Sequence, residues 1–302
     1  AKYVYWLFLT FLICTAFYLS LKMVKPALLQ AGNKKAINAI VFSATVTLAL
    51  HFLRELHLGQ VNYLLLFIYT FACYSFISGK WKLASTLLAI SIFIKPFAIL
   101  FIPYFVIKKK YKEVLVLVIA IVVCAILPLL FYRSVDMTIS QYHLWFNELT
   151  IELSHKQSLL ADANHTIFSV LARYTPLGFL LISAFIGKVY QLSILAILAI
   201  LVYCFVSMKP KSDSSDQNGY FTAIDFALLV ALIPLLAFTS ENAFIYTQFL
   251  VIVVLCNFKK LRLYEKIMAV IGFLFVGGNF AELTGKKLSQ ALDNWSLVSV
   301  GT

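Results

Sequence analysis

The sequence LASTLLAISIFIKPFAILFIPYFVI occupies residues 83–107 and carries a single charge, Lys95, directly before Pro96. A single helix through this stretch would hold a lysine at mid-membrane, which costs about 2.5 to 3.5 kcal/mol on insertion scales. It would also put Lys80 and Lys108 on opposite faces. Proline disfavours a helical residue before it, and each limb is too short to cross. We therefore expect a broken, re-entrant helix pair with Lys95 near its outer tip, surrounded by protein or a water-filled cavity.

The composition of the chain is that of an integral membrane protein. Of its 302 residues, 62% are hydrophobic and only 13% are charged, whereas about a quarter of the residues are charged in soluble domains. The apolar runs are continuous, which favours helices over alternating strands. We expect an all-α polytopic membrane helical bundle, a single transmembrane domain over residues 1–302 with about eight spanning helices and shorter re-entrant or interfacial ones. The expected spans lie near residues 3–20, 36–53, 61–78, 114–132, 189–207, 220–238, 243–258 and 267–281.

The basic residues gather in clusters between the apolar runs, as the positive-inside rule describes. The net charge of +12 therefore indicates orientation and not a nucleic-acid partner. The loops between these clusters hold most of the acidic residues, and we expect them on the outer face. The clusters expected in the cytoplasm contain Lys22, Lys25, Lys34 and Lys35; Lys80 and Lys82; Lys108, Lys109, Lys110 and Lys112; Lys209 and Lys211; and Lys259, Lys260, Arg262 and Lys266.

The longest polar segment, residues 133–175, interleaves polar and apolar residues at near-helical spacing. It is typical of amphipathic helices lying on a membrane surface, here the outer one. The segment supplies Asn164, His165 and Arg173 as candidates for substrate contact. Asp225 lies near the start of its expected span, where an acidic side chain stabilises the helix.

Several classes of chemistry lack their motifs. P-loop ATPases, dinucleotide enzymes and serine hydrolases need glycine-rich or nucleophile-elbow signatures, and none occurs among the 11 glycines. The five cysteines lie singly in apolar runs and the five histidines show no ligand-like spacing, so we expect no metal site and no cofactor. A transferase that takes a sugar from a lipid phosphate needs less, namely an outward carboxylate as base and cations or amides around the phosphate.

A run of short motifs resembles a known family. Gly59-Gln60-Val61-Asn62 opens an apolar helix, a Gly79-Lys80-Trp81 turn follows, and residues 84–94 lead into Lys95-Pro96 and then to Lys108-Lys-Lys-Tyr-Lys112. This order is similar to the central signature of glycosyltransferase family 87, polyprenyl-phosphate-mannose-dependent, alpha-mannosyltransferase-like proteins of the GT-C superfamily. The similarity is strongest over residues 54–112 and continues more weakly through Asn164-His165-Thr166-Ile167 and Leu171-Ala172-Arg173. At residues 234–246 the Trp and His that are common in the family are absent.

The resemblance implies a membrane hexosyltransferase that moves a sugar, often mannose, from a polyprenyl-phosphate donor to a lipid or glycan acceptor, usually with inversion. It also implies a multi-pass protein of the bacterial cytoplasmic membrane whose active face is extracytoplasmic. The family's presumed catalytic Asp lies in the first outer loop, and no residue before Glu55 is acidic. The chain also opens in an apolar run without Met, and residues 295–302 are similar to the start of another span. We expect a chain truncated at both ends whose base lies upstream of Ala1, with Glu55 and Glu241 as weaker candidates.

The residues expected to bind substrate each have a plainer alternative. The side chains of Gln60 and Asn62 could cap a helix and bond neighbouring helices, and Lys95 could extend to the membrane interface without touching substrate. The other candidates could serve in solvated loops or in helix packing. As a whole, the chain could instead be a transporter or flippase, in which broken helices also occur, or a non-catalytic membrane subunit. The residues expected to bind substrate are Arg54, His57, Gln60, Asn62, Lys95, Asn164, His165 and Arg173.

Overall fold

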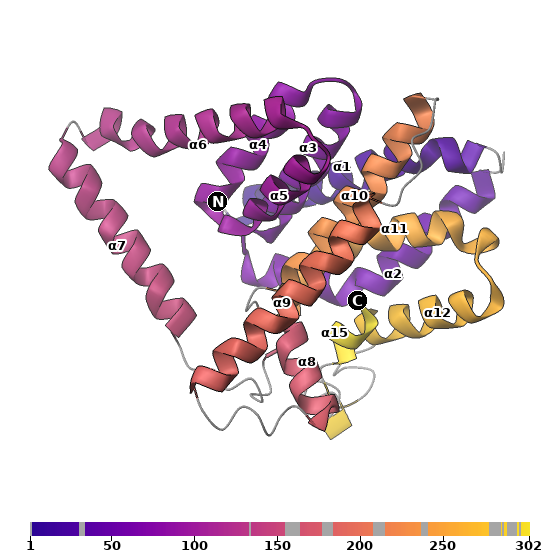
Figure 1. The fold of residues 1–302 in the computed structure, drawn as a ribbon. Coiled ribbons are helices and arrows are strands. Elements are labelled where there is room, and N and C mark those ends of the chain that lie inside the picture. Colours follow the sequence, from indigo (N-terminus) through magenta and orange to yellow (C-terminus); the bar gives the residue numbers. More distant parts are fainter. Residues whose placement is uncertain are drawn as a thin grey trace.

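A computed structural model describes residues 2–29, 34–132, 134–154, 164–176, 184–207, 215–236, 241–277, 285, 287–288, 295 and 297–302. Every regular element within these ranges is helical, which confirms the all-α bundle (Figure 1). In chain order the elements are α1 (Lys2–Leu29), α2 (Lys34–Leu58), α3 (Asn62–Ile77), α4 (Trp81–Ile94), η1 (Pro96–Leu100), α5 (Phe101–Ile107), α6 (Tyr111–Tyr132), α7 (Val135–Ser154), α8 (Ile167–Tyr174), α9 (Ala184–Ser207), α10 (Ser215–Leu236), η3 (Glu241–Thr247), α11 (Gln248–Asn257), η4 (Phe258–Lys260), α12 (Leu263–Gly277) and α15 (Leu297–Gly301).

Within the described ranges, six helical segments are long and apolar enough to cross a membrane. Two further expected spans form helices shorter than these six segments: α3 has 16 residues and α12 has 15. The long segments are Tyr3–Val24, Lys35–Leu58, Tyr111–Tyr132, Lys188–Ser207, Asn218–Leu236 and Ala243–Lys260. The chain is therefore a multi-pass membrane protein, with six long spans beside several shorter apolar helices.

The predicted helix break occurs at Lys95. This residue has extended backbone angles, φ −146° and ψ 133°, and it ends α4, while Pro96 begins the 3-10 helix η1. Proline at the next position forces this conformation, because its ring clashes with a helical residue before it. The structure thus confirms the break that the Lys95-Pro96 pair predicted.

Beyond the break the chain turns back along α3. Lys95 lies beside Asn62 at the start of α3, with 3.0 Å between its Nζ and the Asn62 Oδ1. Farther along, Phe101 lies against Tyr69, and Phe105 lies against Phe76 near the end of α3, with ring centres 5.5 Å apart. η1 and α5 therefore retrace the length of α3 toward the turn from which α4 began, as the sequence predicted.

The two ends of the bundle differ in chemistry. At one end the Tyr5 hydroxyl donates to the Gly59 carbonyl; we call this the Gly59 end. At the other, Lys22 donates to the Tyr74 hydroxyl, and Lys110 Nζ lies 5.7 Å from the centre of the Phe76 ring. This lysine-rich end also holds the turns at Lys80 and Lys109 and the η4 turn. The basic clusters of the described residues therefore share one end, as the positive-inside pattern requires.

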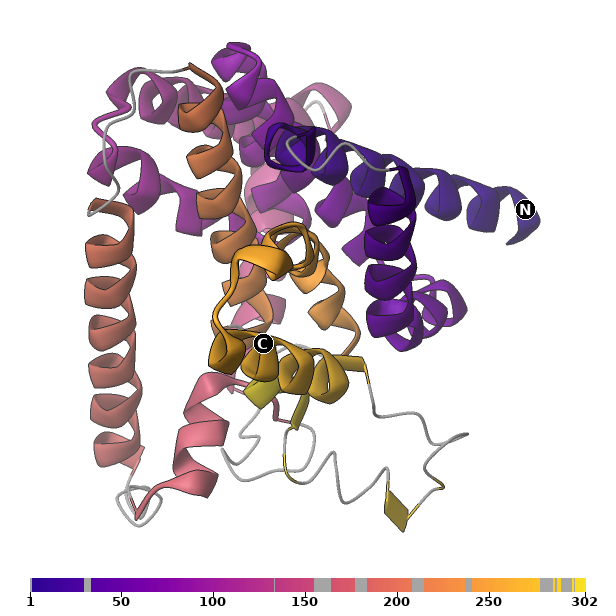
Figure 2. The ribbon, with the colours of Figure 1, turned by 90° about the vertical axis from the view of Figure 1, so that its right-hand side faces the viewer.

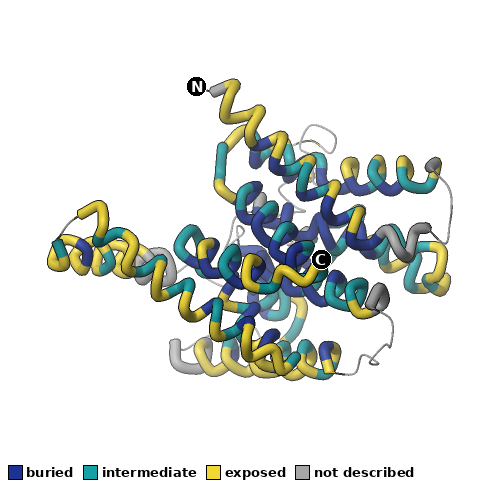
Figure 3. Tube along the Cα trace, turned by 90° about the horizontal axis from the view of Figure 1, so that it is seen from above, coloured by how far each residue is buried: buried dark blue, intermediate teal, exposed yellow. Residues whose placement is uncertain are grey.

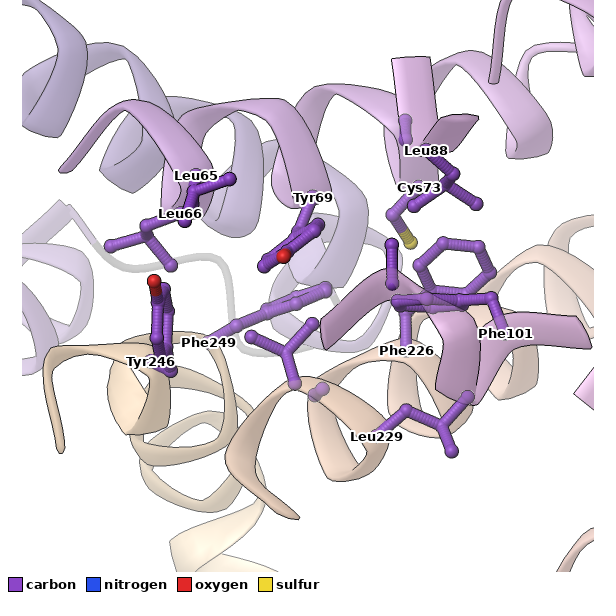
Figure 4. Close-up of a cluster of buried hydrophobic side chains, with 14 of the residues drawn as sticks. Leu65, Leu66, Tyr69, Cys73, Leu88, Phe101, Phe226, Leu229, Tyr246 and Phe249 are labelled. Carbon is purple, nitrogen blue, oxygen red and sulfur yellow. The ribbon is translucent and has the colours of Figure 1, made fainter. Parts of the chain in front are cut away.

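We call η1 and α5 together the returning limb. An aromatic core holds it in place. Figure 4 shows Leu65, Leu66 and Tyr69 of α3 facing Tyr246 and Phe249, with Phe101 beside Phe226 of α10. The rings of Phe101 and Phe226 have centres 4.8 Å apart. Pairs of this kind contribute about 0.5 to 1.5 kcal/mol beyond the burial of their area. The break at Lys95 is thus supported by packing as well as by proline.

The outer helices have largely exposed apolar surfaces. Only 11% of the span in α6 and 17% of that in α9 is buried within the protein, and Figure 3 shows buried residues gathered centrally with exposed ones outside. In a membrane protein such surfaces face lipid. Helix α7, part of the predicted amphipathic segment, extends away from the bundle (Figure 1), and residues 155–163 of that segment lie outside the described ranges.

Candidate functional site

The sharp turn between α2 and α3 creates the polar site. Gly59 has φ +64°, a left-handed conformation that favours glycine, and its N–H donates to the Glu55 carbonyl at 2.8 Å. An added Cβ would lie 3.2 Å from the Tyr5 ring, so the position is also crowded. The turn lets Glu55 at the end of α2 face Asn62 at the start of α3.

Asn62 is the centre of the site. It is fully buried, and its side-chain amide makes all four hydrogen bonds that an amide can make. Oδ1 accepts from Lys95 Nζ and from the Tyr246 hydroxyl, each at 3.0 Å. Nδ2 donates to Glu55 Oε2 at 3.1 Å and to Gln60 Oε1 at 3.0 Å. Because the ammonium of Lys95 can only donate, the amide orientation is fixed.

Glu55 has both carboxylate oxygens engaged by Asn62. Oε1 accepts from the Asn62 backbone N–H at 2.9 Å and Oε2 from the amide, and the residue is fully buried. The carboxylate therefore satisfies one of the N–H groups that lack a partner in the first turn of a helix, where negative charge is also favoured. This geometry suits a residue that positions Asn62 better than one that receives a proton from substrate.

Lys95 is half-buried at the tip of the broken helix. Its ammonium lies 5.7 Å from the centre of the Phe97 ring, and that ring meets Tyr246 edge-on with centres 6.3 Å apart. A cation held at a helix break by an amide and bordered by aromatic rings is suited to bind an anionic group. Lys95, Asn62 and Tyr246 come from three separate parts of the chain, joined by the returning limb and η3.

Arg54 and His57 lie on the last turns of α2, close in sequence to the cluster. Arg54 is half-buried and His57 is exposed, while Gln60 is half-buried and bonded to Asn62. Of the candidates near the turn, the structure thus brings Gln60, Asn62 and Lys95 together. Glu241 begins η3, but its side chain lies outside the described part of the structure.

Asn164 and His165 belong to a second buried cluster. Asn164 Oδ1 accepts from the N–H and the hydroxyl of Thr166, the residue that caps the N-terminus of α8, so Asn164 shapes the start of that helix. The His165 ring lies edge-on to the Phe244 ring, with centres 6.3 Å apart. The His51 ring is tilted against the same Phe244 ring, with centres 6.2 Å apart. Arg173 is half-buried in the last turn of α8.

Sequence reasoning missed Tyr246 and His51 as parts of these clusters. Tyr246 resembles the many aromatic residues at span ends, but it is fully buried and its hydroxyl donates to Asn62. His51 is fully buried one turn before Glu55 and donates from Nε2 to the Val276 carbonyl at 2.8 Å. A buried histidine and glutamate four residues apart on one helix was the available signal.

The first cluster combines one cation, Lys95, with the Asn62 amide and the Glu55 carboxylate. Among the described residues, His, Cys, Asp and Glu side chains do not gather in groups of three that could hold a metal ion. The ammonium of Lys95, held in place by Asn62, supplies the positive charge. Charge at a fixed position in a water-poor site stabilises a leaving group with little reorganisation.

The fold and this site define a multi-pass helical membrane protein with a lysine held at the tip of a broken helix. Residues 1–240 match the model of glycosyltransferase family 87. The chain belongs to this family and is a membrane glycosyltransferase of the GT-C type. Comparison with curated proteins gives no match, and neither does comparison with solved structures.

Proposed function

We propose that this glycosyltransferase moves a sugar, mannose or a related hexose, from a polyprenyl-phosphate donor to a lipid or glycan acceptor. The observation that carries the proposal is the returning limb, which holds the Lys95 ammonium against the Asn62 amide at the Gly59 end. A charged side chain at membrane depth is costly and is a functional-site hypothesis by default. The phosphate of a lipid-linked sugar is the anion that such a membrane-embedded cation would meet.

In the proposed reaction an acceptor hydroxyl oxygen forms a bond to the anomeric carbon while the bond from that carbon to the phosphate oxygen breaks. The leaving polyprenyl phosphate gains negative charge, which the Lys95 ammonium stabilises. Asn62, held by Glu55 and Tyr246, keeps the ammonium in position. The acceptor proton passes to a base, and we assign this role neither to Glu55, whose oxygens are engaged, nor to Glu241.

The other candidate residues have lesser roles in this proposal. Arg54 and His57 extend the polar rim of the α2–α3 turn, and Gln60 supports Asn62. Asn164 shapes the start of α8 and His165 lies against Phe244 of η3, and we assign the acceptor to this side of the protein, with Arg173 among its contacts. The positive-inside pattern supports an extracytoplasmic position for this end of the bundle, in the cytoplasmic membrane of a bacterium.

The test is transfer of radiolabelled mannose from polyprenyl-phosphate-mannose by the full protein in proteoliposomes that contain acceptor lipids. We expect Lys95→Ala to lower the rate about 100-fold, the typical loss when one charge-stabilising donor is removed. Lys95→Arg should retain part of the rate. Lys82→Ala removes an exposed lysine at the opposite end and should leave the rate unchanged.

Two results would overturn the proposal. Wild-type turnover by a correctly inserted Lys95→Ala variant would return Lys95 to a structural role. Movement of the labelled lipid across the bilayer without any transfer of the sugar would favour a flippase. Insertion and folding are checked by membrane fractionation and by size-exclusion chromatography of each variant.

A further inference from the structure

The η4 turn carries a dense group of basic side chains at the lysine-rich end. Lys259, Lys260 and Arg262 are exposed and Lys266 is half-buried. The described structure gives the side chains of these four residues no ion pair. Other lysines at this end are engaged, since Lys108 pairs with Asp225 at 3.3 Å and Lys22 donates to the Tyr74 hydroxyl.

The acidic residue beside this group, Glu265, already accepts hydrogen bonds with both carboxylate oxygens. Glu265 Oε2 accepts from the Arg262 backbone N–H at 2.7 Å, and Oε1 accepts from the Tyr264 hydroxyl at 3.2 Å. This is the reach-back half of a capping box at the start of α12. Its charge offsets one of the four cations, so the turn keeps a net positive charge.

Two apolar hollows open beside the same turn. The larger, of about 520 Å³, lies between α11, α12 and α15 and is lined by residues such as Leu250, Val254, Met268 and Ala269. The smaller, of about 370 Å³, lies between α2, α11 and α12 and is lined by Ala39, Ile40 and Lys259 among others. Phe273 lines both hollows. Figure 2 shows α12 and α15 beside α11 on this side of the bundle.

The hollows and the cations fit one kind of occupant. Both hollows are lined mainly by apolar side chains, and their shared wall helix α11 belongs to the apolar segment Ala243–Lys260, which is long enough to cross a membrane. Basic pockets between membrane helices at the lysine-rich side bind anionic lipid head groups. Lys259 belongs both to the basic turn and to the wall of the smaller hollow, which joins the charged and apolar parts.

We propose that the η4 turn and the two hollows form a binding site for a two-chain anionic phospholipid. The phosphate lies among Lys259, Lys260 and Arg262, and one acyl chain enters each hollow on either side of Phe273. The walls formed by α11 and α12 lie beyond residue 240, where the family match ends. The site is at the opposite end of the bundle from Lys95 and does not depend on the proposed reaction.

The test is a lipid titration of the purified full protein by native mass spectrometry, comparing phosphatidylglycerol with phosphatidylcholine of the same acyl chains. We expect tighter binding of phosphatidylglycerol. Lys259→Gln/Lys260→Gln/Arg262→Gln should weaken that preference by roughly fivefold per cation, on the order of a hundredfold in total. The control Lys80→Gln/Lys82→Gln removes two exposed lysines of another turn at the same end and should keep the preference.

The apolar part of the proposal has its own test. Ala269→Phe and Ala39→Phe each fill one hollow, and both should weaken phosphatidylglycerol binding although the cations are intact. Glycerophosphoglycerol, the same head group without chains, should compete poorly. Equal competition by this soluble compound, or an unchanged preference in the triple variant, would overturn the proposal, as would equal losses in the triple variant and the control.

A second measurement on the unmodified protein covers the case in which a variant does not fold. A phosphatidylglycerol with photoreactive acyl chains should crosslink to residues 248–277 and 36–43 in proteoliposomes. Crosslinks spread evenly over all lipid-facing helices would contradict a specific site.

Discussion

Asn62 illustrates how one buried amide can connect its own helix, α3, to the end of α2, to the helix break at Lys95 and to η3. Its four side-chain bonds use every donor and acceptor it has, and each partner comes from a different position around it. A buried polar group that loses a partner costs about 1 to 3 kcal/mol. The site is therefore sensitive to exchanges that keep the size of the side chain but change its donors.

Asn62→Asp is such an exchange. It replaces the Nδ2 donor with an oxygen about 3 Å from Glu55 Oε2 and Gln60 Oε1, and two carboxylates at that distance cannot both be ionised. We expect a loss of at least about 2 kcal/mol in the free energy of unfolding, because the new acceptor meets two acceptors. Chemical unfolding in detergent measures the loss.

The matched control is Gln60→Ala. It removes one of the two acceptors of Asn62 Nδ2, but Gln60 is half-buried, so water can replace that acceptor and the cost should be no more than about 1 kcal/mol. Equal stability of the Asn62→Asp and Gln60→Ala variants would show that the amide network contributes little.

At the residue scale the sequence singled out some of the polar side chains in the cluster, but it did not indicate which of them contact one another. Lys95 and Asn62 stand out because they are polar residues among apolar ones, and both belong to the cluster. Tyr246 lies 184 positions from Asn62, and a buried tyrosine looks the same in sequence as an interfacial one. Contacts at that separation depend on how helices pack, which apolar periodicity does not specify.

At the element scale, two turns at the lysine-rich end have the same geometry with different residues. Gly79 has φ +78° and Lys109 has φ +57°. In each turn the next residue donates its backbone N–H back into the helix, Lys80 to the Ser75 carbonyl and Lys110 to the Phe105 carbonyl, both at 2.8 Å. Glycine adopts this conformation at little cost, while other residues lose about 1 to 2 kcal/mol.

Opposite exchanges at these turns should have opposite effects. We expect Gly79→Ala to lower the free energy of unfolding by about 1 kcal/mol and Lys109→Gly to raise it by up to about 1 kcal/mol, since relieved strain exceeds the added freedom of the unfolded chain. Thermal unfolding in detergent compares the two. Stabilisation by Gly79→Ala would contradict the left-handed turn.

Asp225 differs from its expected role. We expected it to stabilise a helix start, but α10 begins at Ser215, and Asp225 lies in the interior of this helix. Its carboxylate is buried and pairs with Lys108 at 3.3 Å, and the Tyr104 hydroxyl lies 3.4 Å away. Lys108 also donates to the Val206 carbonyl of α9 at 3.0 Å. The group thus ties the end of α5 to α9 and α10.

Removal of this carboxylate should loosen the returning limb. We expect Asp225→Ala to cost about 1 to 3 kcal/mol, because Tyr104 loses its buried partner and Lys108 loses a partly exposed one. Asp225→Asn keeps an acceptor and should cost less. Asp136→Ala, at an exposed position of α7, is the control, and equal melting temperatures for Asp225→Ala and Asp136→Ala would refute the link.

The break in the chain was predictable because charge and proline coincide at Lys95-Pro96, and both act locally. The number of long spans was not. Helix α3 ends at Ile77, before the turn at Gly79, and it packs against α1 and α4, whereas α12 covers Leu263–Gly277 and packs against α2. Composition alone measures how apolar a run is. The length of the helix that it forms depends on where hydrogen bonds and packing stabilise a turn.

At the scale of the whole molecule, the described basic clusters and the Lys95 site lie at opposite ends of the bundle. This separation follows from the returning limb, since a straight passage through residues 83–107 would have brought Lys108 to the same end as Lys95. The positive-inside rule then predicts the orientation, with the Gly59 end outside the cytoplasm. Access to donor and acceptor from that side depends on this arrangement.

Cysteine labelling in intact cells tests the orientation. In a background without the five native cysteines, His57→Cys, at an exposed position of the Gly59 end, should react with a membrane-impermeant maleimide. Lys82→Cys and Lys109→Cys, exposed at the lysine-rich end, should react only after permeabilisation if their turns face the cytoplasm, as the positive-inside rule predicts. Full labelling of all three in permeabilised cells shows that each thiol is reachable. The reverse pattern would put Lys95 on the cytoplasmic side and leave an extracytoplasmic transfer reaction without its cation.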